Sequence, residues 1–280
     1  MTRSGTPIAA VLLAPGETSH LPALFAHWLK TTGRPGRYVP LYVEPEDLGH
    51  VIQTLPKAGF VGIHVSPTFQ KMALDFADII TDRAALMSAA NTVIFRKDGK
   101  IHADNTDGYG FIENIRQMAP GWNPKSGPAA IYGAGRAARE IVAALLEVGV
   151  EEIRVASRTR PRADVLRNEF GTRIKAVDWL QAGNILEGAH IVVNCTPLGS
   201  EGHPDFRAPL DALVPGAVVC DLVIDPPLTR FLRVAIEAGC NPVDGVGMLL
   251  CQAAPSFERW FGERPPIDDA AREASMDIVL

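Results

Sequence analysis

The stretch Ile131-Tyr132-Gly133-Ala134-Gly135-Arg136-Ala137-Ala138 decides the fold of this 280-residue chain. It reads GxGxxA and lies between a strand-like run, 129–132, and a helix-like run, 137–148. In a strand–turn–helix unit Gly133 allows the tight turn, Gly135 lets the backbone approach a pyrophosphate, and Ala138 lets the helix pack close to the strand. The positive end of the helix then faces the phosphates. An ordinary Gly-rich turn is the alternative, but the complete context favours a dinucleotide site over residues 133–137.

The residues that follow repeat this alternation of strand and helix. Strand-like runs lie at 153–156, 190–194, 218–221 and 241–244, and helix-like runs at 162–170 and 248–261. Repeated βαβ units predict a parallel, doubly wound sheet of the Rossmann type.

The first 107 residues alternate in the same way. We expect strands at 8–14, 38–43 and 62–66, helices at 21–29, 46–55 and 71–80, and a hairpin of 91–96 with 100–103. A helix at 109–118 then leads into a Pro- and Gly-rich loop. The sequence therefore predicts an α/β protein of two domains. Residues 1–107, completed by 244–280, form an α/β substrate-binding and catalytic domain, and residues 108–243 form the Rossmann-type domain.

The segment after the strand at 153–156 selects the nucleotide. An NAD site has Asp or Glu there for the ribose hydroxyls, whereas this chain has Ser157-Arg158-Thr159-Arg160-Pro161-Arg162. Arginine binds phosphate through a planar fork and stacks on adenine, so Ser157, Arg158, Thr159 and Arg162 suit a 2′-phosphate. We therefore predict NADP, with NAD as the alternative. The competing interpretation is a solvated basic loop.

The composition excludes several classes of partner. Hydrophobic residues make up 47% and charged residues 21%, with a net charge of −5 and no basic block, so nothing points to nucleic acid. No apolar run approaches the roughly 20 residues of a membrane span. The four cysteines form no CxxC pair and no His cluster has metal-ligand spacing, so we expect no metal and a reducing compartment. A cytoplasmic enzyme with a small-molecule substrate, monomeric or homodimeric, fits these observations.

Five ordered motifs carry a resemblance to shikimate dehydrogenases across nearly the whole chain. They are Asn91-Thr92, Asp104-Asn105-Thr106-Asp107-Gly108, Ser157-Arg158-Thr159, Asn194-Cys195-Thr196-Pro197-Leu198-Gly199, and Asp244-Gly245-Val246-Gly247-Met248-Leu249 with Gln252-Ala253-Ala254. Ala90 stands where the family usually has Val. The resemblance implies an oxidoreductase of aromatic amino acid biosynthesis that transfers hydride reversibly between NADPH and 3-dehydroshikimate.

The resemblance also implies roles for individual residues. Asp107 matches the Asp of a catalytic Lys-Asp pair, in which one member handles the proton. Asn91 and Gln252 match amides that bind substrate hydroxyls, since an amide both donates and accepts. The remaining matched positions imply cofactor contacts from Thr196, Pro197, Leu198, Gly245 and Met248.

The sequence departs from the family at the other member of that pair. The family motif NVTxPxK aligns with His64-Val65-Ser66-Pro67-Thr68-Phe69-Gln70, which places Gln70 at the catalytic Lys position. Lys71 is adjacent, but the run from Ala73 to Asn91 aligns without a gap, and neighbouring helical positions point about 100° apart. We therefore predict that Gln70 is the site residue. Glutamine can hydrogen-bond an oxygen but cannot transfer the proton.

Further departures affect the carboxylate-binding end of the substrate site. The family's SxS aligns with Ser19-His20-Leu21, a Tyr that closes the pocket aligns with Ile224, and the Thr of NVT is Ser66. A substrate with a different or absent carboxylate is one inference, and a shifted set of donors is the other.

His64 gives rise to a separate hypothesis. An imidazole titrates near neutrality, so a His64–Asp107 pair could take over the proton relay. A hydrogen-bonded structural histidine is the more favoured interpretation. For the whole chain, the leading prediction is an NADP-dependent dehydrogenase of a shikimate-like cyclic hydroxy or keto compound. The alternatives are a non-catalytic NADP-binding regulatory relative and an ordinary shikimate dehydrogenase that uses Lys71.

Overall fold

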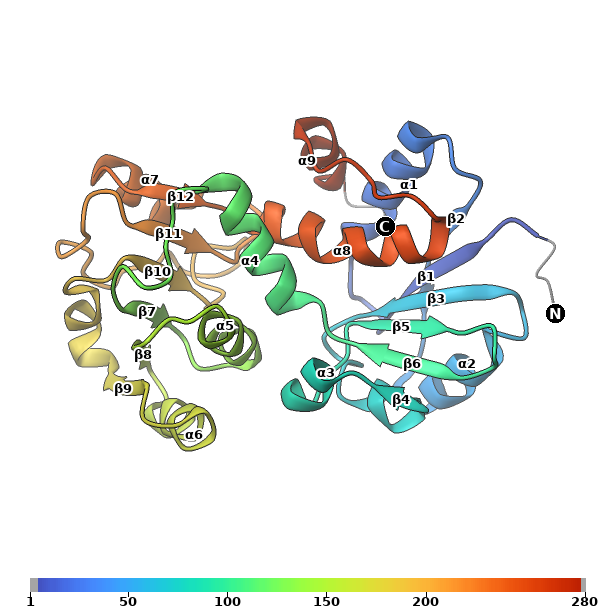
Figure 1. Cartoon of the computed structure of the whole chain (residues 1–280), viewed down its shortest axis with the longest axis horizontal. Helices are drawn as coiled ribbons and strands as arrows, with labels where there is room; N and C mark the ends of the chain where they lie inside the picture. The colour runs from blue at the N-terminus through green and yellow to red at the C-terminus, as the bar shows by residue number, and fades with distance from the viewer. Residues whose placement is uncertain (1–4, 278–280) are drawn as a thin grey trace. The chain divides into compact units, whose positions relative to one another are not determined.

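The computed structural model describes residues 5–277, which divide into two compact units (Figure 1). Unit 1 contains the residues up to Asp107 and those from Gln252 onward, and unit 2 is Gly108–Cys251. Within the described residues, no helix is both long and apolar enough to cross a membrane.

Unit 1 is built on a mixed six-stranded sheet of order β2-β1-β3-β5-β6-β4. Its strands are β1 (Ile8–Leu13), β2 (Arg37–Tyr42), β3 (Phe60–Val65), β4 (Ile79–Ile80), β5 (Thr92–Phe95) and β6 (Ile101–Asp104). Strands β2, β1 and β3 are parallel, β5 runs antiparallel to both β3 and β6, and β4 pairs parallel with β6. The expected strands and hairpin are therefore present, with small shifts at their ends.

Helices cover this sheet because their apolar residues recur at helical spacing. They are α1 (Leu21–Thr32), α2 (Leu48–Thr54), α3 (Asp82–Met87), α9 (Asp269–Ser275), the second half of α8 (Gly245–Phe261), and two 3₁₀ turns, η1 (Pro45–Asp47) and η2 (Met72–Phe76). Helix α1 buries Leu24, Phe25 and Trp28 on one face, and it ends at Gly33, whose φ of 64° is left-handed.

The helix expected over 71–80 is wrong. Only the 3₁₀ turn η2 forms there, and Ala77 is already extended at φ −94°, ψ 134°. The reason is the edge of the sheet. The main-chain N–H of Asp78 donates to Ile101 O at 2.8 Å, and the Asp78 carboxylate accepts from the N–H of Ile101 at 2.8 Å. These bonds draw the following residues into β4.

Unit 2 has a six-stranded sheet of order β12-β11-β10-β7-β8-β9, and every pair in it is parallel. Its strands are β7 (Ala129–Tyr132), β8 (Ile153–Ser157), β9 (Ile174–Asp178), β10 (Ile191–Asn194), β11 (Val218–Asp221) and β12 (Asn241–Val243). Its helices are α4 (Asp107–Met118), α5 (Arg136–Glu147), α6 (Arg160–Phe170), the 3₁₀ segment η3 (Trp179–Leu186), α7 (Arg230–Glu237) and the first half of α8. This strand order is that of the doubly wound Rossmann fold, so the predicted fold class is confirmed.

Both faces of this sheet are covered, as a parallel sheet requires. Along β7, Ala129 and Ile131 join one apolar cluster, whereas Ala130 and Tyr132 join the other. Both clusters are buried, so the fully apolar run at 129–132 is what a central strand between two helical layers needs.

The unit boundary differs from the predicted one at the C-terminal end. Residues 244–251, expected with the N-terminal domain, belong to unit 2. The side chain of Met248 packs against the same unit 2 cluster that contains the buried Val243. Gly245 allows this arrangement, because a Cβ there would lie 2.6 Å from the carbonyl oxygens of Leu222 and Val223.

Candidate active site

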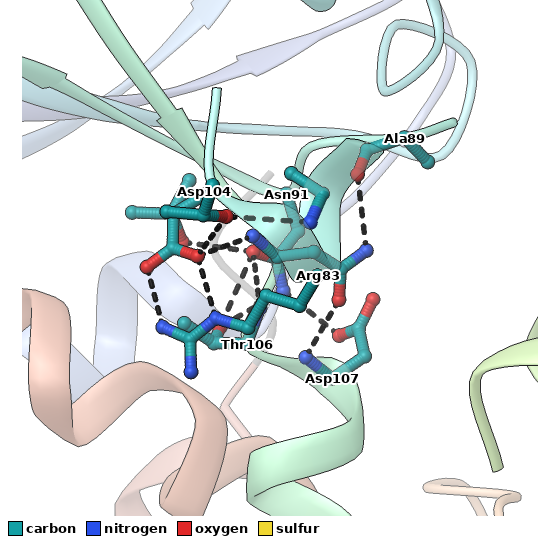
Figure 2. Close-up of polar contacts among 10 residues, drawn as sticks. Arg83, Ala89, Asn91, Asp104, Thr106 and Asp107 are labelled. Atoms are coloured by element: carbon teal, nitrogen blue, oxygen red, sulfur yellow. Dashed lines mark hydrogen bonds and ion pairs between the residues drawn. The ribbon is translucent and has the colours of Figure 1, made fainter. Parts of the chain in front are cut away.

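The segment from Asp104 to Asp107 connects strand β6 to helix α4 and carries a dense polar network (Figure 2). Arg83 binds the Asp104 carboxylate with two bonds, Nε to Oδ1 at 2.6 Å and Nη2 to Oδ2 at 2.5 Å. The hydroxyl of Thr81 donates to Oδ1 at 2.8 Å. Burial alone would raise the pKa of Asp104, but the bonds from Arg83 and Thr81 outweigh it and hold the pKa below its usual value. Asp104 is therefore an ionised anchor for the loop.

The Asn91 amide lies at the centre of this network and contacts Asp107. Its Nδ2 donates to Asp107 Oδ1 at 2.9 Å and to Thr106 Oγ1 at 3.0 Å, while its Oδ1 accepts from the N–H of Thr106 at 3.1 Å. Asn105 adds support, because its side-chain oxygen accepts from the N–H of Asp107 at 3.1 Å. The structure thus brings Asn91 and Asp107 together, and Asp107 is only 8% exposed in the first turn of α4.

Gln70 and Ser66 follow strand β3, and main-chain hydrogen bonds link this segment to the segment that carries Asn91. The N–H of Ala90 donates to Gln70 O at 2.8 Å, and the N–H of Val65 donates to Asn91 O at 3.0 Å. Both polar side chains are buried, Gln70 at 6% and Ser66 at 4% exposure. Within residues 5–277, Gln70 Oε1 and Ser66 Oγ find no hydrogen-bond partner. Unsatisfied buried polar atoms are uncommon, and a bound hydroxyl compound would supply what these two lack.

Lys71 takes the opposite orientation to Gln70. Its side chain is exposed, while that of Gln70 is buried. The alternative in which Lys71 serves the site would require the turn after β3 to rotate.

The imidazole of His64, on strand β3, has a hydrogen-bond partner at each ring nitrogen. Its Nδ1 lies 2.7 Å from the hydroxyl of Tyr38, and its Nε2 lies 2.8 Å from Ser256 Oγ. Aromatic rings of Phe25 and Trp260 surround it, and burial lowers its pKa to about 3. This arrangement contradicts the proposed His64–Asp107 relay, because both ring nitrogens are occupied and the ring stays neutral at physiological pH.

Among residues 5–277, two other predicted substrate residues form no hydrogen bond with the network just described. Ser19 Oγ accepts from the N–H of Leu21 at 3.2 Å and so serves the start of helix α1. Gln252 lies on α8, one turn before Ser256, and is partly exposed.

Glu17 is a polar residue beside Ser66 that sequence reasoning missed. Its Oε1 accepts from Thr68 Oγ1 at 2.6 Å, and its Oε2 accepts from the N–H of Ala14 at 2.7 Å. It lies in no motif, so only its distance of two residues from Ser19 could have drawn attention to it.

The turn of unit 2 between β7 and α5 has the shape of a phosphate cradle. Gly133 has φ 102°, and a Cβ there would lie 3.0 Å from Thr196 Cγ2 and 3.1 Å from Cys195 O. Gly135, by contrast, faces open space, with nothing within 4 Å of a Cβ. It is the N-cap of α5, no side chain caps that helix, and the positive end of the helix dipole lies there, which suits an anion. Both glycines therefore fit a pyrophosphate that approaches along Gly135.

The segment after β8 presents cations and no carboxylate. Arg158 and Arg162 are exposed, and neither forms an ion pair within the described part of the chain, whereas Arg160 pairs with Asp164 at 3.4 Å. The hydroxyl of Ser157 accepts from the N–H of Thr159 at 3.2 Å, which turns the chain at the end of the strand. The arrangement suits a phosphate better than a pair of ribose hydroxyls.

A buried network holds the loop after β10 beside this cradle. Asn194 Oδ1 accepts from Thr196 Oγ1 at 2.6 Å, and Asn194 Nδ2 donates to Asp221 Oδ1 at 3.0 Å. Thr229 Oγ1 donates to Asp221 Oδ2 at 2.6 Å. Burial raises the pKa of Asp221 to about 6, although Thr229 and Asn194 both favour the ionised form. Thr196, Pro197 and Leu198 are positioned by these contacts.

Fold and site together define a two-domain α/β protein of the dinucleotide-binding class, with a buried polar network in its first unit. Among residues 5–277, no group of three or more His, Cys, Asp or Glu side chains is placed to hold a metal ion.

Sequence profiles agree with this assignment along the chain. The profile "Shikimate dehydrogenase substrate binding domain" matches residues 12–93, "Shikimate / quinate 5-dehydrogenase" matches 118–201, and "Shikimate 5′-dehydrogenase C-terminal domain" matches 245–274. The shikimate dehydrogenase (NADP(+)) of Cereibacter sphaeroides strain ATCC 17025 is 57% identical over 268 residues, 96% of each chain. That of Paracoccus denitrificans is 56% identical over 273 residues, 98% of this chain and 97% of the relative. The chain belongs to the shikimate dehydrogenase family.

Solved structures extend the likeness to three dimensions. Shikimate 5-dehydrogenase of Thermus thermophilus, in complex with NADP(H) and shikimate, has a TM-score of 0.83 and 32% identity, over 96% of this chain and 98% of that one. Ligand-free 5-ketofructose reductase of Gluconobacter sp. strain CHM43 has a TM-score of 0.86 and 26% identity, over 98% and 99%.

Proposed function

We propose that this protein is an NADP-dependent oxidoreductase that interconverts a ring alcohol and the corresponding ketone, with shikimate and 3-dehydroshikimate or a close relative as substrates. The observation that carries the proposal is the pairing of Asn91 with Asp107 beside two buried, unpartnered polar atoms, Gln70 Oε1 and Ser66 Oγ. The 50–58% identical relatives named NADP-dependent shikimate dehydrogenases support it independently.

Bound NADP(H) supplies or accepts the hydride at the carbon that changes oxidation state. The Gly133–Gly135 turn and the first N–H groups of α5 are proposed to hold its pyrophosphate, and Arg158 and Arg162 its 2′-phosphate. Thr196, Pro197, Leu198, Gly245 and Met248 are the further residues proposed to line its site.

Within unit 1, Asp107 is the proposed acid–base group. In the oxidation direction its carboxylate accepts the hydroxyl proton of the substrate, and the Asn91 amide holds that carboxylate in place. Gln70 is proposed to orient the reacting oxygen through its side-chain amide, because it cannot itself exchange a proton. Ser66 donates to a substrate oxygen, and Gln252 and Ser19 complete the proposed set.

We also propose that Gln70 replaces the catalytic lysine of the family in this chain. The ungapped alignment, the burial of Gln70 and the exposure of Lys71 support it. A slow proton transfer follows, since a positioned acid–base group contributes about 10²–10⁴ in rate. The names of similar structures include shikimate dehydrogenase, quinate dehydrogenase and 5-ketofructose reductase, so the scaffold serves more than one ring or ketose. We also propose a cytoplasmic location, on the basis of the four free cysteines.

The test is direct. The purified protein is assayed for reduction of NADP and of NAD with shikimate, quinate and a panel of cyclic hydroxy acids and polyols. Turnover of one of these with NADP, lost in Asp107→Asn, is the expected result. Tight NADPH binding without turnover of any compound would instead favour the non-catalytic alternative.

A further inference from the structure

The loop after strand β1 and the loop after strand β3 are joined by one carboxylate, that of Glu17. Its two oxygens accept separately, one from Thr68 Oγ1 at 2.6 Å and one from the N–H of Ala14 at 2.7 Å. Strands β1 and β3 are parallel neighbours with Leu12 opposite Val65, so both loops leave the same edge of the sheet. Glu17 therefore lies where the chain presents Ser66 and Gln70.

The charge of Glu17 is not compensated. Burial alone would raise its pKa, but the hydroxyls of Ser66 and Thr68 and the N–H of Ala14 lower it below the usual value, so the group is ionised at neutral pH. No salt bridge to Glu17 occurs in the part of the chain that the structure describes. A ligand that enters beside Ser66 meets a fixed negative charge.

Glu17 and Gln70 Oε1 leave acceptor positions open at this place. An ionised carboxylate offers about four lone-pair sites, and Glu17 uses two. Gln70 Oε1 is a buried acceptor without a donor, and the Ser66 hydroxyl lies near Glu17 but completes no hydrogen bond of its own. Phe69 N–H donates to Ser66 O at 2.9 Å, which keeps Ser66 and Gln70 in one tight turn. Hydroxyl groups of a ligand satisfy these acceptors, whereas a ligand carboxylate has no proton to give them.

We propose that Glu17 is a specificity-determining residue that selects an uncharged, polyhydroxylated ring or ketose over a carboxylate of the same shape. The inference rests on the proposed function for the location of the substrate, and it adds the chemical class. Like charges placed side by side disfavour the wrong ligand more strongly than they affect the right one.

The experiment compares shikimate with its methyl ester, because the two share a ring and differ in charge. Dissociation constants are measured by calorimetry on NADP-loaded wild type, Glu17→Gln and the control Glu46→Gln, which changes the same charge at an exposed position. The wild type should bind the ester at least about fivefold more tightly than the acid at low salt, and less selectively at high salt. The preference should vanish in Glu17→Gln and persist in Glu46→Gln. If Glu17→Gln does not fold, Thr68→Val replaces it in the test. Thr68→Val releases the Glu17 side chain and should weaken the preference for the ester.

Each possible result either supports or overturns the inference. Equal binding of acid and ester by the wild type, or the same preference in Glu17→Gln, would overturn the inference. Turnover of both ligands in the same samples without any preference would leave the proposed reaction standing and the inference overturned. The expected preference for the ester without turnover of either ligand would support the inference and overturn the proposed reaction. Failure of both ligands to bind would reject both.

Discussion

The Nε2 atom of His64 on strand β3 lies 2.8 Å from Ser256 Oγ on helix α8, and so connects two segments 192 residues apart. The Ser256 hydroxyl also reaches Ala253 O at 2.7 Å within its own helix. With Tyr38 on the other ring nitrogen, His64 is a neutral, saturated element of the core rather than a proton shuttle.

This role predicts a pH dependence of stability. Burial lowers the pKa of folded His64 to about 3, below the value of about 6.5 in an unfolded chain. The unfolded state therefore binds the extra proton between these values. The stabilisation is complete above pH 6.5 and falls by about 1.4 kcal/mol per pH unit below it. Urea unfolding between pH 7.5 and 5.5 measures this slope, which His64→Asn should abolish. Equal slopes in wild type and His64→Asn would contradict a buried neutral imidazole. Loss of turnover in His64→Asn at unchanged stability would instead favour the His64–Asp107 proton relay.

The side chain at position 70 should control the rate of proton transfer. Gln70→Lys introduces a proton-transferring group at the proposed site, and we expect kcat with shikimate to rise by about 10²-fold or more. The measurement is steady-state NADP reduction by wild type and variant. Lys71→Gln is the matched control and should leave kcat unchanged, because Lys71 is exposed. A loss of activity in Lys71→Gln would show that Lys71 is the lysine that serves the site.

The arginines after β8 should set the choice of nucleotide. A charge-assisted bond to a phosphate contributes about 1.5–3 kcal/mol, so Arg158→Ala should raise the KM for NADP by at least about tenfold and change the KM for NAD little. Arg173→Ala removes an exposed arginine elsewhere in the same unit and should affect neither. A parallel rise for both nucleotides in Arg158→Ala would mean that the 2′-phosphate is held elsewhere.

Asp221 gives a pH dependence of the opposite sign to that of His64. Burial raises its pKa from 3.8 to about 6, so the folded state holds the proton more firmly. The stabilisation by this proton is complete below about pH 3.8 and is lost as the pH rises through 6, a change of about 3 kcal/mol. Asp221→Asn stays neutral throughout and should gain about 2 kcal/mol relative to wild type between pH 4.5 and 7.5. Chemical unfolding at these two pH values tests it, and a constant difference would refute the shifted pKa.

Much of the fold could be predicted from local patterns. The apolar run at 129–132, the glycines at 133 and 135 and the βαβ repetition predicted the Rossmann sheet, since each rule depends on residues close in sequence. Strand β9 and helix α7 were missed. Lys175 and Asp178 interrupt the apolar pattern of β9, and its pairing with β8 outweighs that weak local preference.

Only those residues of the candidate site that lie in recognisable sequence motifs could be predicted. The DNTDG stretch pointed to Asp107, and the amide of Asn91 lies against it. The orientation of His64 could not be predicted, because its partners Tyr38 and Ser256 lie 26 and 192 residues away. Glu17 was missed for a similar reason, as its contact with Thr68 spans 51 residues.

The main-chain bond between Ala90 N–H and Gln70 O has a consequence for how this protein can change. It fixes the backbone of position 70 without using the side chain, so a substitution of that side chain leaves this bond in place. The chemistry of the reaction can therefore drift while the scaffold stays the same. Gln70→Lys and its reverse are single substitutions that change the chemistry of this side chain, and a protein engineer can make either one.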